Sequence, residues 1–174
     1  MTVINNCKGG ATAKSMTTQY KIPSKDKERM DKSSTNMDYD FNVIFQGPNG
    51  EPTNNWDNLR QEFKKSITQL IRKGLQPHRT IVLGPLPRGP DTTIWETQMR
   101  TSDKIIDDMH QLGLNTLNVY QNIPQGMRNP KMIFGRNDLR RGHFVHYGQR
   151  ILDMINDMTE SKILELMTNQ GKEK

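Results

Sequence analysis

The side chains best suited to chemistry are imidazole, amide and guanidinium groups in loop-forming stretches of the chain. His143 and His146 could transfer protons, because an imidazole titrates near neutral pH, or they could be ordinary surface histidines. Asn49 stands in a Pro-Asn-Gly triplet, where its amide could donate hydrogen bonds or simply complete a β-turn. Three arginines could bind phosphate or only solvate a loop: Arg136, Arg140 and Arg141.

The close pair of histidines does not by itself predict a metal site. The other two histidines lie far away in the sequence, and the single cysteine, Cys7, is not near the pair. The sequence also lacks a glycine-rich phosphate loop of the usual spacing, which argues against a phosphate-binding α/β domain. We therefore expect neither a metal ion nor a cofactor.

Composition and charge narrow the class of protein. A hydrophobic fraction of 32% and a mean hydropathy of −0.84 require much loop or solvated surface. The net charge of +6 favours anionic partners, nucleic acid among them. One cysteine excludes an intramolecular disulfide, and no apolar run approaches the ~20 residues of a membrane span. Asn5, Asn6 and Lys8 interrupt any signal-peptide core, so we expect a cytoplasmic protein whose oligomeric state is open.

Apolar patterns predict the elements that position these residues. Short apolar runs predict strands over residues 2–4, 41–45, 80–83 and 115–123. Helical spacing predicts a short helix after residue 12, helices over 56–73 and 94–112, and a last helix from about 147. The alternation predicts one domain over 1–168, a three-layer α/β/α fold of flavodoxin-like type with a mainly parallel sheet. A flexible polar loop is expected at about 23–37 and a disordered tail at 169–174.

Loops at the carboxyl ends of the strands are where an α/β sheet gathers its functional groups. Four loops qualify here, around Gly10, Asn49, Pro87 and His143.

In these loops the sequence resembles the SGNH (GDSL-type) hydrolases. The segment ending in Gly9-Gly10-Ala11-Thr12 is similar to the family's second block, and Gly47-Pro48-Asn49-Gly50 to its third. Leu86-Pro87-Arg88 is similar to a strand end found in many members, and the stretch from His143 to Gly148 to the last block. These four motifs occur in the family's order over about 150 residues. Within the family, the sequence most resembles the esterase-like domains of non-long-terminal-repeat retroelements.

The resemblance implies an acyl-transfer site for a small ester. It makes Gly10 and Asn49 the oxyanion donors and His143 the catalytic base. Gly47, Arg140 and His146 are secondary candidates. The sequence departs from the family in having no Gly-Asp-Ser turn, so the nucleophile and the first strand of the sheet are missing. The aspartate expected three residues before His143 is replaced by Arg140, and Asp138 stands at a different offset.

Two hypotheses follow. The first is an esterase-like domain that is incomplete or inactive as this chain. The second is a degenerate SGNH-like domain that serves as a binding or scaffold module, associated with nucleic acid or a retroelement. A strand followed by Gly-Asp-Ser encoded just before Met1 would favour the first, and its absence would favour the second.

Overall fold

A parallel sheet forms the centre of the fold. The computed structural model describes residues 11–19 and 41–170. Within them, three strands lie in the order β1-β2-β3, namely β1 (Asn42–Phe45), β2 (Thr80–Leu83) and β3 (Asn115–Leu117). Both pairings are parallel, with Ile44 opposite Val82 and Val82 opposite Thr116. The strand predicted at 2–4 and the loop predicted at 23–37 lie outside the described residues.

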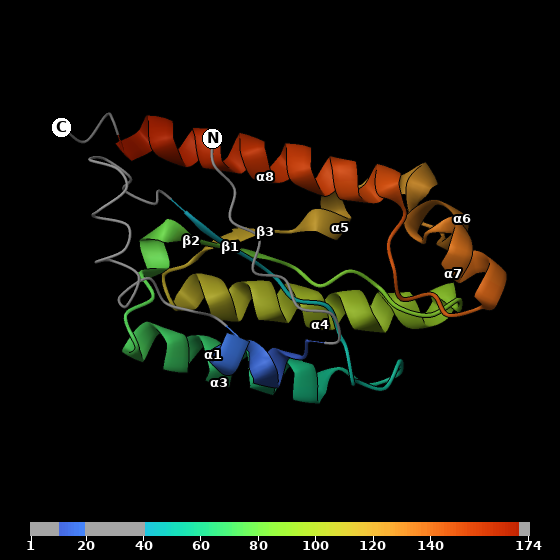
Figure 1. The fold of residues 1–174 in the computed structure, drawn as a ribbon, viewed down its shortest axis with the longest axis horizontal. Helices are drawn as coiled ribbons and strands as arrows, with labels where there is room; N and C mark the ends of the chain where they lie inside the picture. Colours follow the sequence, from blue (N-terminus) through green and yellow to red (C-terminus); the bar gives the residue numbers. More distant parts are fainter. Residues whose placement is uncertain (1–10, 20–40, 171–174) are drawn as a thin grey trace.

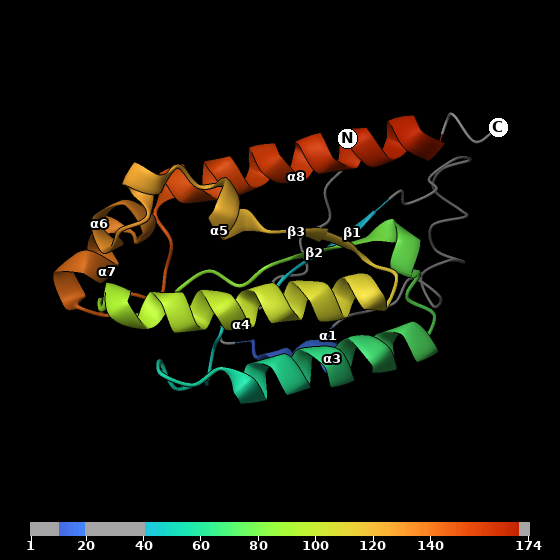
Figure 2. The ribbon, with the colours of Figure 1, turned by 180° about the vertical axis from the view of Figure 1, so that it is seen from behind.

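Helices cover both faces of this sheet, which confirms the three-layer α/β/α prediction. One face carries α3 (Asp57–Arg72), α4 (Thr92–Gln111), the short α1 (Met16–Gln19) and η1 (Ala13–Ser15). The other carries α8 (Gln149–Gln170) and α6 (Pro130–Ile133), and Figures 1 and 2 show α8 lying across the sheet on the side opposite α3. The structure further describes the short helical segments η2 (Pro77–Arg79), α5 (Val119–Asn122), η3 (Gln125–Met127) and α7 (Arg136–Arg141).

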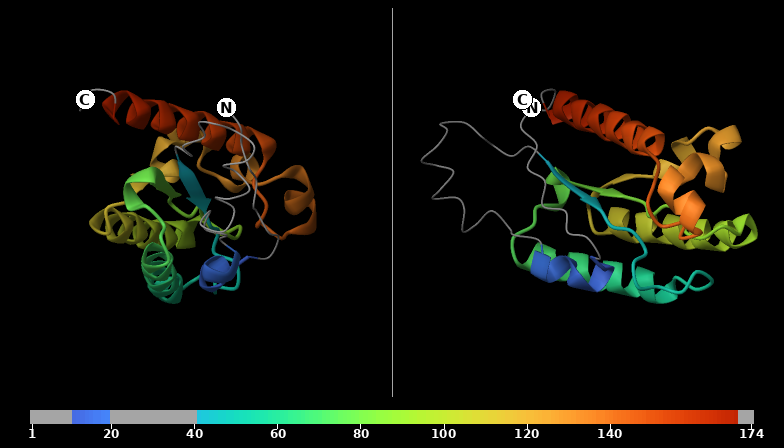
Figure 3. Two further views of the ribbon diagram at one scale, coloured as in Figure 1. Left: turned by 60° about the vertical axis from the view of Figure 1, so that its left-hand side comes forward. Right: turned by 45° about the vertical axis from the view of Figure 1, so that its right-hand side comes forward.

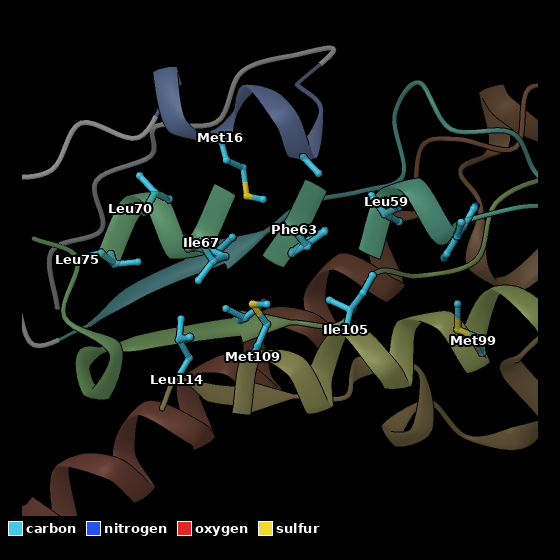
Figure 4. Packing of buried hydrophobic residues seen from close by; sticks show 14 residues of the cluster. Met16, Leu59, Phe63, Ile67, Leu70, Leu75, Met99, Ile105, Met109 and Leu114 are labelled. Atoms are coloured by element: carbon cyan, nitrogen blue, oxygen red, sulfur yellow. The ribbon is translucent and has the colours of Figure 1, made fainter. Parts of the chain in front are cut away.

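Alternating side chains of the strands separate two apolar cores. Ile44 and Val82 join the core beneath α1, α3 and α4, whose packing Figure 4 shows around Phe63 and Ile67. Ile81 and Leu83, one residue away along β2, join the core beneath α6 and α8. Neighbouring residues of a strand point to opposite faces, so a β2 buried at every position is expected for a strand covered on both sides.

The two long helices on one face of the sheet, α3 and α4, begin and end close to their predicted bounds. Asp91 caps α4 by accepting a hydrogen bond from the backbone N–H of Thr93 at 2.9 Å. Gly113 follows α4 with a φ of 83°, a left-handed conformation that ends helices and favours glycine.

The second half of the chain differs from the sequence expectations at three places. The strand predicted over 115–123 ends at Leu117, because the Asn118 side chain accepts a hydrogen bond from Gln121 N at 3.2 Å and starts α5. The last helix begins at Gln149 and continues to Gln170, so residues 169 and 170 are helical. Within α8, the apolar spacing of the sequence predicts that Ile151 and Leu152 are both buried; Ile151 is fully buried, but Leu152 is 36% exposed.

Residues 11–19 pack against the α3 side of the molecule. Ala13 and Met16 are buried in the core that α1, α3 and α4 cover. The Ser66 hydroxyl on α3 donates to the Ala13 carbonyl at 2.9 Å. In Figure 3, η1 and α1 lie alongside α3 in both views. Among the helices that the structure describes, none is both long and apolar enough to cross a membrane.

Candidate functional site

Three loops meet at the carboxyl edge of the sheet, at the right-hand end of Figure 1. Arg88, after β2, donates from Nη1 to the carbonyls of Pro48 and Glu51, both at 3.3 Å, and so contacts the loop after β1. The Gly89 N–H donates to the Phe144 carbonyl at 3.2 Å, which ties the same loop to the one before α8. The loops around Asn49, Pro87 and His143 therefore lie together, as expected at such an edge.

Asn49 is held by a backbone carbonyl close to the first predicted loop. Its Nδ2 donates to the Ala11 carbonyl at 2.8 Å, and Gln46 Nε2 donates to the same oxygen at 2.7 Å. One of the two Asn49 amide hydrogens is thus engaged, and the other is the one that a substrate oxygen could use. Gly10, the other expected oxyanion donor, lies outside the described residues.

A carboxylate–imidazole pair stands on the loop before α8. Asp138 Oδ1 lies 2.9 Å from His146 Nδ1, and Asp138 Oδ2 accepts from the N–H groups of Val145 at 2.7 Å and His146 at 2.6 Å. The His146 side chain is 81% exposed while Asp138 is buried. An ionised Asp138 fixes the proton on Nδ1, which leaves the Nε2 lone pair facing solvent, the arrangement of an oriented general base.

The charge of Asp138 is maintained by its hydrogen bonds. Burial by itself would raise the pKa of this carboxyl, but the N–H groups of His146 and Val145 and the imidazole outweigh it and lower the pKa to about 2. Asp138 is therefore a carboxylate at every pH at which His146 could act as a base.

His143 sits in a tight turn and has a different environment. Its side chain is exposed and makes no hydrogen bond within the described part of the chain, although its backbone N–H donates to the Asp138 carbonyl at 3.1 Å. Gly142 before it has a φ of 68° and Phe144 after it a φ of 46°, a conformation that is uncommon and strained for a phenylalanine. Phe144 is held there by edge-on packing against Phe134, with ring centroids 5.6 Å apart.

The secondary candidates are divided between this edge and the surface beside it. Gly47 is half-buried, and its carbonyl accepts from Gln46 Nε2 at 3.0 Å, so it helps to shape the Asn49 loop. Arg140 is exposed on α7, with no ion pair among the described residues. Gly148, at the end of the same stretch, lies close to the Phe134 backbone, because an added Cβ would lie 3.2 Å from the Phe134 carbonyl oxygen.

No serine in the described ranges is placed to act as a nucleophile beside His146. Ser66 and Ser102 are buried, and their hydroxyls donate to the carbonyls of Ala13 and Pro85. Ser15 belongs to a capping box with Thr12, and Ser161 lies on the exposed side of α8.

Other parts of the structure do not extend the site. Two cavities, of about 270 Å³ and 460 Å³, are lined by residues of α4, α5, α8 and their neighbours, and not by Asn49, Arg88 or His146. Over residues 11–19 and 41–170, no group of three histidine, cysteine, aspartate or glutamate side chains could hold a metal ion.

Sequence reasoning missed the pairing of Asp138 with His146. The one available signal was that Asp138 is the sole acidic residue between 128 and 150. The spacing of eight residues between the partners matches no local motif, because it is produced by the turn at Gly142 and Phe144.

Comparison with family models, with curated proteins and with solved structures gave no match to this chain.

Proposed function

We propose that the carboxyl edge of the sheet is an ester-hydrolysing site of the SGNH type in which His146, oriented by Asp138, is the base. The observation that carries this proposal is the contact of the buried Asp138 carboxylate with Nδ1 of an exposed imidazole. The Asn49 amide, on the loop that Arg88 ties to this edge, supplies a donor for the carbonyl oxygen on which charge develops. The substrate class is a small acyl ester.

His146 takes over the role that the family resemblance gives to His143. In the proposed reaction, Nε2 of His146 removes a proton from the attacking hydroxyl as its oxygen bonds to the ester carbonyl carbon. Asp138 stabilises the imidazolium, which then gives the proton to the leaving alkoxide as the ester bond breaks. Because no serine of the described residues lies beside His146, the attacking group is a water molecule. We therefore expect a slow reaction.

The test is hydrolysis of p-nitrophenyl acetate by the full chain. We expect His146→Ala to lower the rate about tenfold, less than the hundredfold or more typical of a complete general-base site. His143→Ala and His78→Ala are matched controls, since both remove exposed imidazoles, and they should retain most of the rate. A fluorophosphonate probe should not label the chain.

Each other outcome has a definite meaning. A rate that depends on His143 instead of His146 would move the base back to the position implied by the resemblance. Rates equal to that of wild type in all three variants would exclude a base at this edge. A serine labelled by the fluorophosphonate probe would overturn the water mechanism.

The second candidate is a module that binds without turnover. It is favoured by the absence of a positioned nucleophile among residues 11–19 and 41–170, and equal rates in the assay above would support it.

A further inference from the structure

Most of the net positive charge of the chain comes from one segment. Residues 128–150 contain six arginines and lysines and one acidic residue, a net charge of +5, compared with +6 for all 174 residues. This segment forms α6, α7 and the turn before α8, at one end of the molecule in Figures 1 and 2.

Three of these cations lie on one face of α7. At 3.6 residues per turn, positions 136, 137, 140 and 141 share one side of the helix. The structure exposes Arg136, Arg140 and Arg141 on that side and turns Asp138 and Leu139 inward. We call the three exposed arginines the α7 arginine face.

Among residues 11–19 and 41–170, no acidic side chain forms an ion pair with the α7 arginine face. Asp138 is the acid nearest in sequence, but it is buried and its oxygens are used by Val145 and His146. In the portion of the chain that the structure describes, none of the three arginines takes part in an ion pair. The described structure therefore presents three guanidinium groups to solvent on α7, without an ion pair to any residue that it describes.

We propose that the α7 arginine face binds the phosphate backbone of duplex nucleic acid, independently of base sequence. Arginine favours phosphate because its planar guanidinium can donate two parallel hydrogen bonds to the oxygens. Single-stranded nucleic acid would require exposed rings for base stacking, and the three aromatic residues of this segment, Phe134, Phe144 and Tyr147, are all buried or half-buried.

A lipid surface fits the same face less well. Stable binding to a membrane surface usually combines cations with apolar side chains that insert beside them. The large apolar residues that the structure exposes lie on β1 and α8: Val43, Leu152, Leu164 and Met167. None lies on α6 or α7, so the α7 arginine face has charge but no apolar anchor.

The experiment measures binding of the full chain to fluorescent duplexes of about 20 base pairs, in DNA and in RNA, between about 50 and 200 mM salt. The test variant combines Arg136→Gln, Arg140→Gln and Arg141→Gln. The matched control combines Lys65→Gln, Arg72→Gln and Lys73→Gln, which removes the same charge from exposed positions of α3 and its end. Circular dichroism checks that both variants fold.

We expect wild type to bind both duplexes with a steep salt dependence. Each phosphate contact contributes about −0.9 to the slope of log affinity against log salt, so the test variant should lose between two and three units of slope, with binding weakened at least tenfold. The control should stay within about twofold of wild type. Unchanged binding by the test variant, or an equal loss in the control, would overturn the proposal.

Two further arms separate the possible anions. Tighter binding to single strands than to duplexes would overturn the choice of duplex. Equally tight, arginine-dependent binding to phosphatidylserine vesicles would make the partner a membrane. Both results are independent of ester hydrolysis, because neither reports on His146.

Discussion

Asp138 links the fold to the candidate site through a single carboxylate. Its two oxygens accept three hydrogen bonds, two from backbone N–H groups and one from the His146 imidazole. The backbone bonds hold the turn that joins α7 to α8, and the imidazole bond orients the proposed base. Loss of the charge should therefore affect stability and activity together.

Asp138→Asn should lower the free energy of unfolding at neutral pH by about 2–3 kcal/mol, the usual range for hydrogen bonds to a buried charge. The pKa of Asp138 in the folded protein, about 2, is below its ordinary value of 3.8. This contribution to stability is thus present above about pH 4 and is lost as the pH falls towards 2. The difference between wild type and variant should shrink over that interval in urea titrations.

Asp157→Asn on α8 is the control, because Asp157 is exposed and has no hydrogen bond from its side chain in the described structure. It should change stability by less than about 0.5 kcal/mol. A pH-independent difference for Asp138→Asn would show that the charge is not what holds the turn.

At the scale of elements, β1 depends on the packing of one aromatic ring. Phe45 ends the apolar run predicted as a strand over 41–45, and such a run is expected to lie in the core. The structure leaves it half-buried, stacked on Tyr147 with ring centroids 6.1 Å apart. Burial raises the pKa of Tyr147 far above its usual range, so this ring stays neutral and the stack is an apolar contact between β1 and the turn before α8.

Phe45→Ala should cost about 2–3 kcal/mol, which is less than the 3–5 kcal/mol typical of a fully buried phenylalanine. Denaturant melts measure the loss. Val43→Ala on the same strand is the comparison, because Val43 is 41% exposed and should lose less than about 1 kcal/mol. Similar losses at both positions would mean that the strand as a whole, and not the Phe45–Tyr147 contact, determines the effect.

Elements with strong local signals were predictable from the sequence. Apolar spacing located α3 and α4, and turn residues located the loops at the carboxyl edge. The end of β3 was not predictable, because Asn118 can either complete a strand pattern or cap a helix. Tertiary contacts determine which of the two structures forms. The Asp138–His146 pair was not predictable either, since it forms across a turn with a left-handed Phe144, a conformation that tertiary contacts such as the packing on Phe134 stabilise.

At the scale of the whole molecule, the low hydrophobic fraction is compatible with two small cores. The sheet divides the apolar residues between its faces, and each face is closed by helices. The excess positive charge is placed outside both cores, at the end that carries α6 and α7. The net positive charge of residues 128–150 and the candidate site thus lie at the same end of the fold. The loops after the parallel strands all open at this end.

Residues 11–19 make this architecture divisible. In the described structure, their attachment includes buried Ala13 and Met16, the Ser66 hydroxyl on the Ala13 carbonyl, and two side-chain amides on the Ala11 carbonyl. These contacts need no covalent link to the remainder, so a chain cut at a protease site engineered between residues 20 and 40 should remain one particle. The two polypeptides should elute together from a sizing column, whereas Ala13→Glu should release the shorter one. We expect that such a molecule can be reassembled from the short and the long fragment expressed separately, with recovery of the melting transition as the readout of their association.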